Sequence, residues 1–162
     1  MANKKRSDEE LTEIYYKYRT MLYRVCFTYM KNNDDTADAV QETFYRLIRS
    51  CPVFDSDEHE KAWLLRTAAN VCKDELKRAH RKNVSINDHT ELEGDSEPHV
   101  DEVMCEIIKL PDKYKAPVYL YYYEGYTSSE ISKILKKPDS TIRNHISEAR
   151  KLLIKRLGEN FI

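Results

Sequence analysis

Apolar residues recur at helical spacing along most of the chain. The first such stripe begins after Asp8, runs for more than five turns and stops at the polar Asn32-Asn33-Asp34. A period near 3.6 over this length predicts an amphipathic helix with one buried face. The residues of the expected buried face are Leu11, Ile14, Tyr15, Tyr18, Leu22, Val25, Cys26 and Tyr29.

Two further stripes complete a predicted N-terminal domain over residues 8–82. The spacing predicts one helix from about Asp35 to Arg49 and another from about Glu60 to Lys82, with Cys51 to Glu60 as the loop between them. The second helix is expected to bury Val40, Phe44, Leu47 and Ile48, and the third Trp63, Leu64, Ala68, Val71 and Leu76.

Residues 83–99, NVSINDHTELEGDSEPH, interrupt the apolar pattern and predict an acidic linker. A second helical domain is expected over residues 100–158, starting with a short helix from Val100 to Lys109. The next helix contains Pro117, which costs about 3 kcal/mol in a helix interior. We therefore expect this helix to kink or to start near Lys115.

The last third of the chain has the pattern of a helix-turn-helix. Thr127 and Glu130 have the spacing of a capping box, and Pro138 ends the short helix that they begin. Asp139 or Ser140 is expected to cap the following helix, whose apolar stripe is Ile142, Ile146, Ala149, Leu153 and Leu157. With only three glycines in 162 residues, the whole chain is predicted to be all-α: two small helical domains, the second a helix-turn-helix.

The polar face of that last helix favours DNA binding over a merely solvated surface. Side chains that can reach base edges and phosphates repeat there at spacings of three and four residues. A capped first helix and a tight turn strengthen this interpretation, because a surface helix needs neither. The candidate DNA-contacting residues are Arg143, Asn144, Ser147, Arg150 and Lys151.

Charge is segregated along the chain, although its net value is only −1. Residues 61–82 hold seven basic and two acidic side chains, and residues 125–157 hold eight basic and three acidic ones. Between them, residues 83–106 hold eight acidic and no basic side chains. Two basic segments separated by an acidic one are typical of a protein that contacts nucleic acid at two places.

The cysteines and the N-terminus exclude several other classes. Cys26, Cys51, Cys72 and Cys105 are too far apart in sequence to form the paired ligands of a zinc site, so free thiols are expected, with no metal and no cofactor. The N-terminal MANKKRSDEE lacks the apolar core of a signal peptide, and no apolar run approaches a membrane span. We expect a cytoplasmic protein that does not insert into the membrane.

Three blocks of the sequence resemble the extracytoplasmic-function (group IV) sigma factors, the smallest members of the bacterial sigma-70 family. DTADAVQETF, from Asp35 to Phe44, resembles the helix of the second conserved region that binds the polymerase. AWLLRTAANVCKD, from Ala62 to Asp74, resembles the helix that melts the promoter and reads the −10 element. The block that begins LPDKYKAPVYLYYYEGYTSSEI at Leu110 and runs to Leu157 resembles the fourth region, which reads the −35 element.

This resemblance implies an alternative sigma factor with three sets of contact residues. Asp35, Asp38, Gln41 and Glu42 would bind the β′ clamp helices of core RNA polymerase. Phe54 and Asn70 would hold an unstacked −10 base, with Lys73, Lys77 and Arg78 on the phosphates; for Phe54, a plain hydrophobic plug under the loop is an equal alternative. The helix-turn-helix would read the −35 element and dock on the β flap, and Glu148, where a basic residue is frequent, departs from the family pattern. An anti-sigma factor is a further implied partner.

Two other classes of function stay open from the residues alone. A stand-alone helix-turn-helix transcriptional regulator would explain the C-terminal third, but neither the QETF block nor the second basic helix. A nuclease would need clustered carboxylates or a histidine-based acid–base pair, whereas the five histidines are scattered along the chain. The sequence therefore predicts a DNA-binding protein that is not an enzyme.

Overall fold

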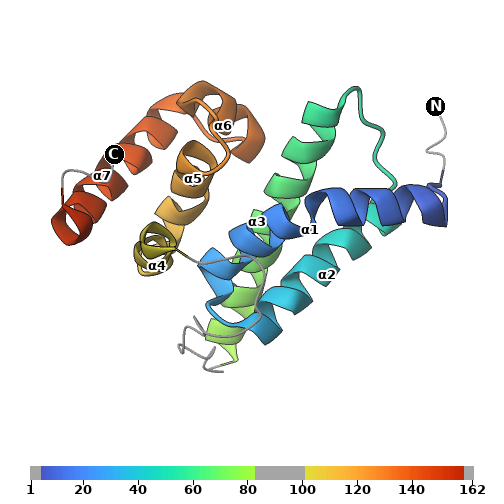
Figure 1. Ribbon diagram of the computed structural model, residues 1–162, viewed down its shortest axis with the longest axis horizontal. Helices are drawn as coiled ribbons and strands as arrows, with labels where there is room; N and C mark the ends of the chain where they lie inside the picture. Colours follow the sequence, from blue (N-terminus) through green and yellow to red (C-terminus); the bar gives the residue numbers. More distant parts are fainter. Residues whose placement is uncertain (1–4, 83–100, 159–162) are drawn as a thin grey trace. The chain divides into compact units, whose positions relative to one another are not determined.

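The computed structural model describes residues 5–82 and 101–158, and the chain divides into two compact units, Met1–Pro98 and His99–Ile162 (Figure 1). All regular structure in the described residues is helical, which confirms the all-α prediction. The predicted linker, residues 83–99, lies outside the described residues. The first unit contains α1 (Asp8–Met30), α2 (Asn33–Ser50) and α3 (Asp57–Arg81); the second contains α4 (Glu102–Ile108), α5 (Asp112–Tyr122), α6 (Ser128–Leu135) and α7 (Asp139–Leu157).

Short polar side chains start each helix of the first unit. Ser7, Asn32 and Ser56 are the N-caps of α1, α2 and α3, and each side-chain oxygen accepts a hydrogen bond from a backbone N–H of the first turn. The third helix therefore begins at Asp57, one turn earlier than the apolar pattern predicts, because Ser56 satisfies its first orphan donors.

The three helices pack against one another around one core. Leu22, Leu47 and Leu64, one from each helix, are fully buried, which confirms the predicted stripes at these positions. Tyr15 and Ile48 are 40% and 43% exposed, so their predicted burial is wrong. Trp63 is only partly buried.

The core also contains two thiols. Cys26 on α1 and Cys72 on α3 are both fully buried and hydrogen-bond to each other. This hydrogen bond and the burial raise the pKa of Cys26 well above its ordinary value, which keeps the thiol neutral. All four cysteines are free, as the sequence predicts.

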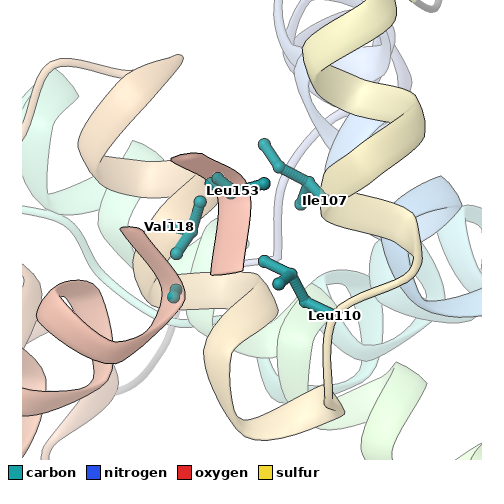
Figure 2. Close-up of a cluster of buried hydrophobic side chains, with 5 residues drawn as sticks. Ile107, Leu110, Val118 and Leu153 are labelled. Carbon is teal, nitrogen blue, oxygen red and sulfur yellow. The ribbon is translucent and has the colours of Figure 1, made fainter. Parts of the chain in front are cut away.

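The second unit is built on a cluster of apolar side chains from three helices and the connection between α4 and α5 (Figure 2). Its members are Ile107, Leu110, Val118, Ala149 and Leu153. Pro117 lies inside α5, and the expected later start near Lys115 is wrong, because the helix begins at Asp112. Pro117 lies in the middle of α5, where its missing N–H removes one hydrogen bond of the helix, and the burial of the residues on either side of it offsets this loss.

The helix-turn-helix forms as predicted, with one difference at the second helix. The capping box of Thr127 and Glu130 starts α6, and Lys136, in the left-handed region, ends it. Neither Asp139 nor Ser140 caps α7: Pro138 occupies the N-cap position and Asp139 is the first helical residue. The fixed φ of proline is compatible with the entry of a helix, but its side chain has no hydrogen-bond acceptor, so α7 starts without a side-chain cap.

Candidate functional site

The outer face of α2 carries the four residues predicted to bind the polymerase. Asp38 and Gln41 are exposed, whereas Asp35 and Glu42 are half-buried and have structural partners. The Asp35 carboxylate accepts a hydrogen bond of 2.8 Å from the Asn32 amide. Glu42 pairs with Arg46 at 3.3 Å, and Arg46 reaches Asp74 of α3 at 3.4 Å. These four residues thus lie on one helix face, and two of them are held in place by neighbouring polar groups.

A hydrophobic groove of about 790 Å³ runs between α1 and α2 beside this face. Sequence reasoning missed it, because the apolar stripe assigned Tyr15 and Ile48 to the core. The pairs of aromatic residues at adjacent positions, Tyr15 with Tyr16 and Phe44 with Tyr45, are the signal that could have revealed it, because neighbouring residues of a helix cannot all face the core. The groove is lined mainly by Tyr15, Tyr23, Val40, Phe44, Tyr45 and Ile48.

A second, more polar hollow of about 570 Å³ connects the polymerase-binding candidates with α3. Its lining includes Asp35, Asp38, Gln41 and Glu42 from α2, and Glu75 and Arg78 from α3. Arg78 pairs with Glu75, so this candidate phosphate contact is already engaged with a carboxylate. The structure therefore brings one predicted DNA contact beside the predicted polymerase contacts.

Phe54 lies in the loop between α2 and α3, surrounded by other aromatic and cationic groups. Its ring centroid is 5.2 Å from that of His59 and 5.9 Å from that of Trp63, both at steep interplanar angles. The Arg6 guanidinium lies over the ring, 5.0 Å from its centroid. Phe54 is only partly buried, so part of the ring remains accessible.

Asn70 and Lys77 continue the same stripe of α3 that begins at Trp63. Residues seven apart lie on one helix face. With a rise of about 1.5 Å per residue, Trp63, Asn70 and Lys77 follow one another at intervals of about 10 Å along the axis. Both side chains are exposed, whereas Lys73, on the adjoining turn, is half-buried. Phe54, Asn70 and Lys77 thus share one side of α3 at different heights.

The polar face of α7 is fully available to solvent. Arg143, Asn144, Ser147, Arg150 and Lys151 are all exposed, while Ile142, Ile146, Ala149 and Leu153 are buried. Two of the cations are paired within the helix: Arg143 with Asp139 at 3.8 Å and Lys151 with Glu148 at 3.3 Å. Both pairs are exposed, and pairs of this kind contribute little and exchange readily with other anions.

One local contact stabilises the start of α6, and another holds α7 against α5. Thr127 hydrogen-bonds to the Glu130 carboxylate, and these bonds lower the pKa of Glu130. The His145 ring of α7 meets the Tyr114 ring of α5 at a centroid distance of 5.5 Å. The polar face of α7 therefore lies on a helix that is anchored on its opposite side.

Within residues 5–82 and 101–158, no three His, Cys, Asp or Glu side chains gather as they would around a metal ion. None of the helices described there is long and apolar enough to cross a membrane. The described surfaces include an acidic face of α2 beside a hydrophobic groove, an aromatic loop next to the basic helix α3, and an exposed polar face on α7. These features define a two-unit helical protein that binds DNA and another protein.

Comparison with known families identifies this class. Residues 14–82 match the model of sigma-70 region 2, and residues 101–153 match that of sigma-70 region 4. The chain belongs to the sigma-70 family, in its extracytoplasmic-function group. It is an alternative sigma factor, a non-enzymatic subunit that directs RNA polymerase in promoter recognition, DNA melting and transcription initiation.

Characterised relatives agree with this assignment along nearly the whole chain. The chain is 25% identical to the ECF RNA polymerase sigma factor SigW of Bacillus subtilis, over 96% of this chain and 93% of that protein. It is 29% identical to the sigma factor SigM of the same organism, over 88% and 92% respectively. The fold matches that of the sigma factor RpoE of Bartonella quintana, solved in complex with the anti-sigma factor NepR, with a TM-score of 0.76, 18% identity and coverage of 94% and 99%.

Proposed function

We propose that this sigma factor binds core RNA polymerase through the outer face of α2. Asp35, Asp38, Gln41 and Glu42 would contact the β′ clamp helices. These residues share one face of the helix, and Asn32 and Arg46 hold two of them, Asp35 and Glu42, in place. A carboxylate that is already oriented loses less side-chain entropy when it meets a cationic partner. The hydrophobic groove between α1 and α2 would extend the same contact.

The −10 element would be opened and held by the loop of Phe54 and by α3. Phe54 supplies a partly open aromatic surface on which an unstacked base can lie, and the exposed Asn70 amide can read a base edge. Lys73, Lys77 and Arg78 follow along the helix and would neutralise phosphates. Unstacking a base costs a few kcal/mol, which its capture offsets.

The −35 element would be read by α7. The exposed polar face of this helix is the main support for the proposal. Five polar side chains at helical spacing, Arg143, Asn144, Ser147, Arg150 and Lys151, occupy the exposed face of the second helix of a helix-turn-helix. Such a helix fits the major groove, where Asn and Arg can make paired hydrogen bonds with base edges. The same unit would dock on the β flap.

The cellular setting follows from the same assignment. A subunit of RNA polymerase acts where the polymerase acts, so we place this protein in the cytoplasm. The complex of Bartonella RpoE with NepR supports an anti-sigma factor as a further partner here. An apolar groove beside an acidic helix face is a surface that such a protein could cover.

Run-off transcription with core polymerase tests the proposal. The chain is expected to produce a discrete start site that neither polymerase nor the chain produces alone, and replacement of Asp38, Gln41 and Glu42 by alanine together should abolish it. A triple alanine variant at Glu9, Thr12 and Glu13, which are exposed on α1, removes the same charge and should retain activity. Unaltered transcription by the α2 variant would contradict the assigned polymerase contact, provided that both variants keep their helical circular dichroism.

A further inference from the structure

Arg6 lies outside the matched region 2, which begins at residue 14, yet it contacts the loop between α2 and α3. It directly precedes Ser7, the N-cap of α1, so the start of that helix fixes where its backbone lies. Its side chain lines a small crevice together with Leu11, Leu47 and Ile48. The guanidinium is thus carried to the loop on a stem that packs against apolar residues.

Two interactions join Arg6 to the loop. Its Nη2 donates a hydrogen bond to the backbone carbonyl of Pro52, 46 residues away in sequence. Its guanidinium also lies over the ring of Phe54. A planar guanidinium can stack on an aromatic ring and donate hydrogen bonds at its edge at the same time, which a lysine ammonium cannot.

The other end of the loop is held by α3. The backbone N–H of Asp55 donates to Nδ1 of His59 at 3.1 Å, and Ser56 caps the helix. Phe54 therefore lies between a restraint at Pro52, formed by Arg6, and a restraint at Asp55, formed by His59. Without Arg6, the loop would keep only the second of these.

The loop is surrounded by negative charges, which a cation at the position of Arg6 partly offsets. The loop and the first turn of α3 carry several carboxylates, and the side chains of Asp55 and Asp57 are 95% and 87% exposed. A DNA strand that approaches Phe54 must come close to these carboxylates, which repel its phosphates. Lys17 is paired with Asp57 at 3.5 Å, whereas Arg6 lies directly over the aromatic ring.

We infer that Arg6 is a positioning residue of the −10 site: it fixes the loop and the ring of Phe54 in the orientation that captures an unstacked base. This inference rests on the proposed role of Phe54. It extends the −10 site to a residue on the N-terminal side of the family region. Arg6 acts through Phe54 and the loop.

The test measures binding of the complete holoenzyme to single-stranded oligonucleotides of the non-template −10 element, with an abasic site placed at each position in turn. In the unaltered protein, one abasic position should weaken binding, since base stacking is lost there. Arg6→Ala should weaken binding of the intact oligonucleotide about tenfold and should also reduce the penalty of that abasic position, as Phe54→Ala is expected to do. Arg6→Lys keeps the charge and should recover binding only in part.

Lys5→Ala is the matched control, because it removes one charge from the adjacent, exposed position and should bind as the unaltered protein does. Polymerase binding and thermal unfolding of the variants should be unchanged, which separates loop positioning from a general loss of structure. If Arg6→Ala binds like Lys5→Ala, or more tightly than the unaltered protein, the inference about Arg6 is overturned while the role of Phe54 stands. If no abasic position matters even in the unaltered protein, the capture of a base by Phe54 is overturned, and the role of Arg6 with it.

Discussion

At the scale of single residues, the capping box that begins α6 makes a stability prediction that depends on pH. The backbone N–H of Thr127 donates to the Glu130 carboxylate at 3.0 Å, and the Thr127 side chain accepts from the N–H of Glu130 at 3.1 Å. Hydrogen bonds from Thr127 lower the pKa of Glu130, so the folded state favours the ionised carboxylate. The stabilisation is therefore present above the unfolded pKa of about 4.3 and is lost as the pH falls through the lower folded value.

Glu130→Gln should consequently lower the melting temperature of the C-terminal unit at pH 7, and the difference should close as the pH falls through the lowered pKa of Glu130 in the folded state. Glutamine can still accept the hydrogen bond, so the substitution isolates the charge. In a Thr127→Ala background, which itself costs about 1 kcal/mol, the effect of Glu130→Gln should shrink but persist, because the backbone N–H still donates. Thermal unfolding over a pH series from 7 into the acid range measures this, and a difference that stays constant down to the acid unfolding of the unit would exclude the assigned role of the charge.

The starts of α6 and α7 show what the local sequence can and cannot predict. Thr127 and Glu130 were predicted as a capping box and form one, since both partners lie within a single turn. Asp139 or Ser140 was predicted as a cap on equally local grounds, but Pro138 takes the N-cap position, and the Asp139 carboxylate pairs with Arg143 instead. Which of two adjacent residues is the cap depends on where the turn ends, and that is decided by packing of α6 against α7.

At the scale of the element, substitutions on the exposed face of α7 should change DNA binding in two distinguishable ways. Asn144→Ala removes a side chain that can read an adenine edge, and should cost about 1–3 kcal/mol at one base position of the −35 element. Lys151→Ala removes a phosphate contact and should weaken binding equally on all sequences. The slope of the logarithm of the binding constant against the logarithm of the salt concentration should decrease by about one. Competition binding of the holoenzyme to a −35 library at several salt concentrations resolves the two.

Glu148→Gln serves as the control for Lys151. It removes the carboxylate that pairs with Lys151 at 3.3 Å and should strengthen binding on all sequences without changing the base preference. A change of base preference instead would show that Glu148 itself reads a base. An unaltered base preference in Asn144→Ala would mean that this side chain does not face the bases.

Helix periodicity predicted every element, but it predicted the extent of burial less well. A stripe shows which face of a helix can pack, not how far its neighbours extend along it. Tyr15 and Ile48 lie on the predicted faces of α1 and α2, yet they border a groove, because no third element covers them in the described residues. For the same reason the Arg6 contact could not be read from the sequence: it joins residues 46 apart through a loop whose path no periodicity fixes.

At the scale of the whole molecule, two DNA-contacting units in one chain predict strong cooperation through the polymerase. Each unit carries one basic segment, residues 61–82 or 125–157, with a net charge of +5. A unit that neutralises about three phosphates loses roughly 40-fold in affinity between about 50 and 200 mM salt, so neither unit alone holds a promoter at moderate salt. When the polymerase fixes both units at the spacing of the promoter elements, the second contact becomes intramolecular and gains a high effective concentration.

The free protein should therefore bind promoter DNA weakly, with a steep dependence on salt, and the holoenzyme should bind it tightly. The gain should be far larger on a promoter with the natural spacing between its −35 and −10 elements than on one lengthened by five base pairs, about half a turn of DNA, because the insertion prevents simultaneous contact. Fluorescence anisotropy with both DNA molecules, with and without core polymerase, measures this. Tight, salt-insensitive binding by the chain alone, or equal holoenzyme affinity for the two spacings, would show that the units do not depend on the polymerase for their joint contact with DNA.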